Sequence, residues 1–180
     1  MIRRWPLFVA LGVSSLAAAI VGAQVAVVAP APLVARNQVR LTLSGAEVIL
    51  RAAQEKAREL KLNVNLAVAD DGGHLIAFQR MDGARPASVY TAITKATAAA
   101  TLRKPTGPAS AGDDSAVWLS LSLEHTAAAS GGKLTTLYGG VPVILDGQVA
   151  GAVGVGGGTG QQDAEIARAG IERLLQELSR

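Results

Sequence analysis

The pattern of apolar and polar positions begins with an amphipathic helix that is predicted to end at about Leu60. Small or apolar residues recur there at helical spacing, while charged residues occupy the other faces; the apolar positions are Ile49, Ala53, Ala57 and Leu60. Ser44, followed three residues later by Glu47, has the form of a capping box, in which each residue satisfies a backbone N–H of the other. The sequence therefore predicts Ser44 as the N-cap.

Alternation with a period of two then predicts a β-hairpin. In residues 63–69 one face carries Val64, Leu66 and Val68. Residues 70–73, Asp-Asp-Gly-Gly, supply the predicted turn, and residues 74–80 form the returning strand.

The middle of the chain gives one clear element and one ambiguous segment. A second helix is predicted to begin within residues 86–88 and to run through Ala100 or Leu102. Residues 117–123 alternate serine with apolar residues, a pattern that fits a short strand or a helical turn. Residues 126–133 consist of small residues and predict a loop.

The C-terminal third predicts a second hairpin and a last helix. Residues 140–145 form a strand, Asp146-Gly147 has the composition of a type I′ turn, and residues 148–155 return. A glycine-rich loop at residues 156–160 opens onto a helix over residues 161–178. Two hairpins and several helices predict an antiparallel sheet with helices packed on it.

The first 23 residues have the form of an export signal. Arg3 and Arg4 precede an apolar run, and the small residues Val21-Gly22-Ala23 predict cleavage before Gln24. An uncleaved membrane anchor is the alternative, because the apolar character continues to about Ala29.

Residues 24–40 then form a linker to a domain at residues 41–180. The chain of 180 residues fits one such domain. Hydrophobic residues make up 49% of it and aromatic residues only 3%, so the core must consist of Ala, Val, Leu and Ile. The absence of cysteine excludes disulfides, thiol nucleophiles and cysteine-based zinc sites.

The charge balance argues against a nucleic-acid partner. The chain has 17 Lys and Arg residues against 14 Asp and Glu residues, and removal of the leader with Arg3 and Arg4 leaves 15 against 14. A nucleic-acid-binding domain needs a strongly basic patch, which this balance does not provide.

The glycine-rich loop before the last helix has two interpretations. A strand-to-helix junction favours anions, but residues 156–160 lack the lysine of a P-loop and the spacing of a dinucleotide-binding motif. We therefore interpret the loop as a tight turn, with Thr159 or Asp163 capping the helix.

Three side chains outside that loop could bind a ligand or form an ion pair. His74 follows the predicted turn on the strand face of Ile76 and Phe78, where it would be a structural residue or an axial ligand in a flat hydrophobic pocket. His125 is the only other histidine, and the two do not form a zinc motif. Lys95, in an apolar helix, could pair with Asp82, hold a propionate or extend to solvent, the last being the default.

Taken together, these segments resemble the GlcG/HbpS-like haem-binding family, which includes the C-terminal domain of PduO-type proteins. The resemblance spans roughly Leu41 to Leu178. It is carried by residues 67–75 with 80–83, residues 92–96 with 103–106, and residues 139–143, 151–155 and 162–163.

The resemblance implies an α/β fold of the α+β type: a profilin-like, five-stranded antiparallel sheet flanked by helices, in a homo-oligomer. It implies haem or a related tetrapyrrole as the ligand, with His74 or, less favourably, Thr106 as the iron ligand. The cations that could pair with the haem propionates are Lys95, Arg80, Arg103 and Lys104.

We accordingly expect an exported haem-binding accessory protein, periplasmic or secreted, linked to redox or haem sensing. One alternative is an enzyme that degrades haem or acts on a small organic acid, with Lys95 and Asp82 in acid–base roles. Another is an interaction partner of a membrane sensor protein. The family resemblance fixes the fold better than the function.

Overall fold

The computed structural model describes residue 34, residues 36–108 and residues 114–180. Arg36–Arg180 is one compact unit. The predicted signal peptide and most of the linker lie outside the described residues. Among the described helices, none is long and apolar enough to cross a membrane.

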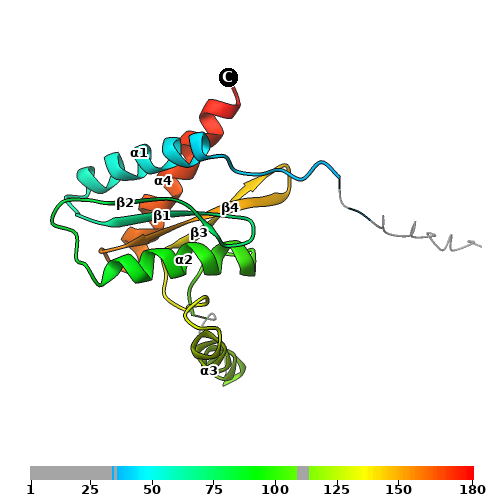
Figure 1. Ribbon diagram of the computed structural model, residues 1–180. Coiled ribbons are helices and arrows are strands. Elements are labelled where there is room, and N and C mark those ends of the chain that lie inside the picture. Colours follow the sequence, from blue (N-terminus) through cyan, green and yellow to red (C-terminus); the bar gives the residue numbers. More distant parts are fainter. Residues whose placement is uncertain (1–33, 35, 109–113) are drawn as a thin grey trace, which may run out of the picture. The chain divides into compact units, whose positions relative to one another are not determined.

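The described part of the chain contains four helices and four strands (Figure 1). In order they are α1 (Leu43–Glu59), β1 (Asn65–Asp70), β2 (Leu75–Arg80), α2 (Ser88–Leu102), α3 (Asp114–Ala129), β3 (Gly140–Leu145), β4 (Gln148–Gly156) and α4 (Gly160–Leu178).

The strands form one antiparallel sheet in the order β2-β1-β4-β3. The expected mixed fold with an antiparallel sheet flanked by helices is confirmed, but the expectation of five strands is wrong, because the described residues contain four. The ambiguous residues 117–123 belong to α3, so they do not extend the sheet. Their alternating serines do not force a strand, since the three leucines favour a helix and no described strand pairs with the segment.

The two faces of the sheet are packed differently. Helices α1 and α4 cover one face and α2 covers the other (Figure 1). The first face holds the larger core side chains, among them Ile49, Val64, Leu66, Val68, Val153, Val155 and Ile166. The predicted alternation of residues 64, 66 and 68 is therefore confirmed.

Helix α2 lies unusually close to β4, because glycines and alanines form the contact. A Cβ atom at Gly154 would overlap the carbonyl of Ala92 and the amide of Ala96, and one at Gly156 would lie 2.6 Å from the carbonyl of Ser88. Ala67 and Ala69 complete the contact from β1. The helix backbone therefore rests almost directly on the sheet.

Two local expectations have different outcomes. The turn Asp146-Gly147 has φ values of 49° and 72°, which confirms type I′ geometry. The predicted N-cap Ser44 is wrong: α1 begins two residues earlier, and the hydroxyl of Thr42 accepts the N–H of Gly45 at 3.2 Å. The hydroxyl of a threonine can accept a backbone N–H as that of a serine does. Thr42 lies two residues before Ser44 and is the N-cap in its place.

Helix α3 lies apart from both layers. It makes no close backbone contact with any other described helix or strand. Its large apolar side chains Val117, Trp118, Leu119 and Leu121 are exposed. The predicted loop at residues 126–133 begins later than expected, because α3 continues to Ala129.

The close contact between α2 and β4 generates the first prediction. Gly154→Ala should reduce the free energy of unfolding by about 3 kcal/mol or more, because the added methyl can be accommodated only if the helix backbone moves. Urea unfolding followed by circular dichroism measures the loss.

Gly132→Ala is the control. An added Cβ there meets nothing within 4 Å, and only the φ of +80° opposes it, so a loss of about 1 kcal/mol is expected. Equal losses in the two variants would contradict the close packing of α2.

Candidate functional site

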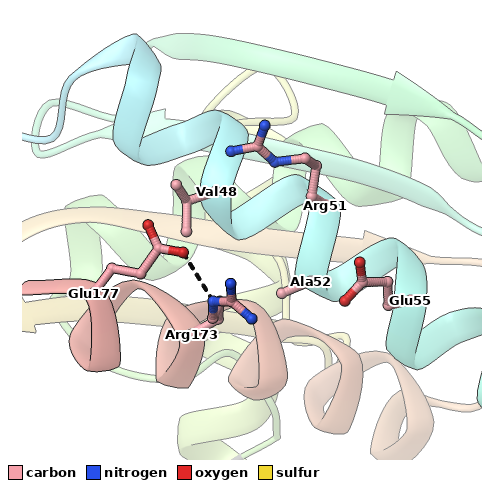
Figure 2. Close-up of a pocket in the computed structure, with 6 residues that line it drawn as sticks. All are labelled: Val48, Arg51, Ala52, Glu55, Arg173 and Glu177. Atoms are coloured by element: carbon pink, nitrogen blue, oxygen red, sulfur yellow. Dashed lines mark hydrogen bonds and ion pairs between the residues drawn. The ribbon is translucent and has the colours of Figure 1, made fainter.

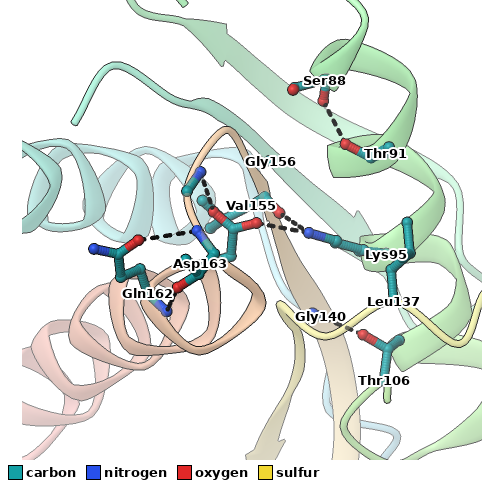
Figure 3. A network of polar contacts seen from close by, with 12 residues as sticks. Ser88, Thr91, Lys95, Thr106, Leu137, Gly140, Val155, Gly156, Gln162 and Asp163 are labelled. Carbon is teal, nitrogen blue, oxygen red and sulfur yellow. Dashed lines mark hydrogen bonds and ion pairs between the residues drawn. The ribbon is translucent and has the colours of Figure 1, made fainter. Parts of the chain in front are cut away.

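Lys95 is buried at the centre of a polar network between α2, β4 and α4. Its side chain is 5% exposed, and Nζ donates to the carbonyl of Val155 at 2.8 Å and to Oδ2 of Asp163 at 2.7 Å (Figure 3). The predictions that Lys95 extends to solvent or pairs with Asp82 are both wrong. Asp163 lies 68 residues away in another helix, so sequence spacing gave no signal of this ion pair.

Asp163 also fixes the start of α4. Its Oδ1 accepts the N–H of Gly158 at 2.9 Å. Thr159 is the N-cap and forms a capping box with Gln162, in which each side chain accepts the other residue's backbone N–H. Several N–H groups that could hold a phosphate are therefore already satisfied by the chain. The glycine-rich loop is a capped turn, as predicted.

Beside this network lies a pocket of about 460 Å³, which is within the usual size range for small-molecule sites. Lys95 and Asp163 line one part of it, and Leu137 and Tyr138 line another. Arg85, on the segment between β2 and α2, supplies a further cation. No sequence motif marks Arg85, because it is an isolated arginine in a loop.

Arg85 is held in place at two points. Its backbone carbonyl accepts Nδ2 of the buried Asn65 at 3.1 Å, and its Nε donates to the hydroxyl of Ser88 at 2.9 Å. Ser88 is itself fully buried. The base of the guanidinium is thus fixed, while its two terminal nitrogens form no hydrogen bond or ion pair within the described part of the chain.

His74 lies outside this pocket, in the turn before β2. Its side chain is 83% exposed, and Nδ1 lies 3.3 Å from Oδ2 of Asp70. Asp70 Oδ1 also accepts the backbone N–H groups of Gly72 and His74. The imidazole therefore projects to solvent and does not join the core as a strand residue.

These contacts change the acidity of Asp70. Partial burial acts to raise its pKa, but the hydrogen bonds from His74 and Gly72 and the charge of the imidazole outweigh it and hold the pKa below its ordinary value. The carboxylate therefore stabilises the turn above its ordinary pKa, and this contribution is lost as the pH falls through the lowered value.

Thr106 is buried at the opposite edge of the sheet. It is 4% exposed, and its Oγ1 accepts the N–H of Gly140 at 2.9 Å. Gly140 begins β3, one edge strand, whereas His74 precedes β2, the other edge strand. The two predicted iron-ligand candidates therefore do not meet within one chain.

The remaining predicted residues are dispersed. Arg80 ends β2 and donates from Nη2 to the carbonyl of Ala84 at 3.3 Å. Arg103 is the left-handed C-cap of α2, and Lys104 follows it; both are exposed. They lie beyond Thr101, whose methyl group approaches Gly73 in the turn that precedes His74.

A second hollow, between α1 and α4, is less suited to a ligand. Arg51, Glu55, Arg173 and Glu177 surround a volume of about 110 Å³ (Figure 2). Its charges balance, and Arg173 already pairs with Glu177 at 2.9 Å. The described residues also contain no cluster of three or more metal-ligating side chains.

The buried ion pair generates the second prediction. Lys95→Met removes the ammonium and leaves the Asp163 carboxylate buried, so the free energy of unfolding should fall by about 3–5 kcal/mol. Lys56→Met is the matched control: Lys56 pairs with Glu165 at the surface, and its loss should be much smaller. Equal losses of unfolding free energy in the two variants, measured by urea unfolding, would show that the buried ion pair contributes no more to stability than the surface pair.

Comparison with known proteins gives a consistent result. Residues 41–172 match the family model described as haem degrading protein HbpS-like. Protein GlcG of Escherichia coli K12 is 43% identical over 120 residues, which cover 67% of this chain and 84% of GlcG.

Two solved structures extend the comparison. The Klebsiella pneumoniae protein ORFY is 30% identical with a TM-score of 0.68, covering 81% of this chain and 98% of that one. The PduOC:heme complex is 26% identical with a TM-score of 0.62, covering 75% and 95%. With the sheet and helices described above, these similarities show that the chain belongs to the HbpS-like family.

Proposed function

We propose that this protein binds haem, with His74 as the iron ligand. The family and the solved PduOC:heme complex support a haem-related role. The observation that carries the assignment to His74 is its pairing with Asp70. A histidine that binds a metal usually gives its other ring N–H to a carboxylate, which orients the ring and raises its basicity.

The surroundings of His74 fit this role. With Nδ1 beside Asp70, Nε2 is the nitrogen that faces away from the carboxylate and can bind iron. Leu75, the next residue, is 48% exposed and offers apolar surface to a porphyrin. Bound haem would supply a redox-active iron, and the protein's part is to hold it through the imidazole.

Cations near the same end of α2 are available for the propionates. Thr97 donates from Oγ1 to the carbonyl of Gly73 at 2.9 Å, so the last turns of α2 lie beside the turn that precedes His74. Arg103 and Lys104 follow this end of the helix and are exposed. Lys95 is a poorer candidate, because Asp163 already neutralises it. Thr106 is poorer than His74 as an iron ligand, because its hydroxyl oxygen already accepts a backbone N–H.

The haem proposal is tested by titration. Haem added to residues 24–180 should give a saturable Soret shift that His74→Ala abolishes and that His125→Ala, on the exposed surface of α3, leaves intact. Asp70→Asn should weaken binding by about tenfold or more, because the imidazole loses its carboxylate. Unchanged binding in His74→Ala would overturn the assignment.

We further propose that the protein is exported, with residues 1–23 removed. The paired arginines, the apolar run and the small residues at 21–23 support this proposal. Expression of the full chain in a Gram-negative host, followed by fractionation and mass spectrometry, should find a periplasmic protein that begins at Gln24. A cytoplasmic protein with an intact leader would count against export, and an intact leader in the membrane fraction would favour the anchor.

A further inference from the structure

The pocket beside Lys95 has a cationic wall and an apolar wall, and the haem proposal uses neither. Arg85 and Lys95 contribute two positive charges and Asp163 one negative charge, which leaves one net positive charge. Leu137 and Tyr138 contribute the apolar wall and are 52% and 51% exposed. We propose that this pocket binds a single carboxylate group attached to an apolar body, with Arg85 as the residue that recognises the carboxylate.

The charge count favours one carboxylate over a phosphate. A monoanion would neutralise the pocket, whereas a phosphate dianion would leave an excess negative charge beside Asp163. At the N-terminus of α4, the N–H groups of Gly158, Thr159 and Gln162 are already used within the capping arrangement and add no donors for a second negative charge.

Arg85 has the geometry that such recognition needs. A guanidinium binds the two oxygens of a carboxylate through two parallel N–H donors. In Arg85 the Nε is occupied by Ser88, which leaves the terminal nitrogens for a ligand and fixes the base of the group before the ligand arrives. Less conformational entropy is then lost on binding.

Lys95 provides a further N–H donor, although Asp163 balances its charge. An ammonium has three N–H donors, and Val155 and Asp163 accept two of them. The third is available at the pocket that Lys95 lines. Because Lys95 and Asp163 are both almost fully buried, the lower part of the pocket is rigid and poorly screened by water.

The apolar wall is also fixed in position. Tyr138 packs between Gly107 and Gly160, since a Cβ atom at either glycine would collide with it. Its exposure therefore belongs to the folded arrangement and does not reflect a loose side chain. Together with Leu137 and Pro108 it can cover the hydrocarbon part of a ligand.

The carboxylate could come from a free apolar acid or from a haem propionate. Hexanoate is the probe, and hexanamide, which has the same apolar body without the charge, is the matched control ligand. Wild-type protein should bind hexanoate saturably in calorimetric titrations and hexanamide at least about tenfold more weakly. Arg85→Gln should weaken hexanoate binding by a similar factor.

Arg58→Gln is the control variant, because Arg58 is exposed on α1, which covers the other face of the sheet. It removes the same charge and should leave hexanoate binding unchanged. Hexanoate that binds Arg85→Gln as tightly as wild type, or no saturable binding by folded wild type, would overturn the proposal.

Competition with haem identifies the source of the carboxylate. If hexanoate displaces haem and Arg85→Gln weakens haem binding, the pocket holds a propionate. If haem and hexanoate bind together, the pocket holds a free acid and is independent of His74. Loss of haem binding in His74→Ala does not bear on hexanoate binding, so the two proposals can fail separately.

Discussion

The close approach of α2 to β4 is the constraint on which the rest of this structure depends. Gly154 and Gly156 leave no side chain between the strand and the helix, and alanines on α2 fill the remaining space. A contact of this kind buries little apolar surface for each residue, but it fixes the height of the helix above the sheet. That height places Lys95 Nζ within hydrogen-bonding distance of the carbonyl of Val155.

The buried ion pair follows from this geometry and then determines the local chemistry. Lys95 is only 5% exposed beneath the helix, so its ammonium needs a partner, and Asp163 at the start of α4 provides one. Because the pair is buried, the cost of removing both charges from water offsets much of their attraction. Lys95 contacts both Asp163 on α4 and Val155 on β4, so the pair joins α2 to these elements at the wall of the pocket beside Arg85.

Local features of the fold could be predicted from the sequence, whereas contacts between distant segments could not. The strand at residues 65–70 and the Asp146-Gly147 turn follow from alternation and turn chemistry. The pairing of Lys95 with Asp163 joins two helices, and the pattern of apolar residues in neither helix indicates this contact. The role of Arg85 depends on Asn65 and Ser88, which surround it only in the folded chain. His74 was identified as a candidate, but its exposure depends on the turn held by Asp70.

Helix α3 and the core of the domain are expected to differ in stability against opening. It makes no close backbone contact with the other described helices and strands, so its opening requires no rupture of the core. Its amide protons should accordingly exchange with solvent through local opening, while the amide protons of β1 and β4 should exchange only when the whole domain unfolds. A thermal midpoint measured on the core thus reports nothing about the state of α3.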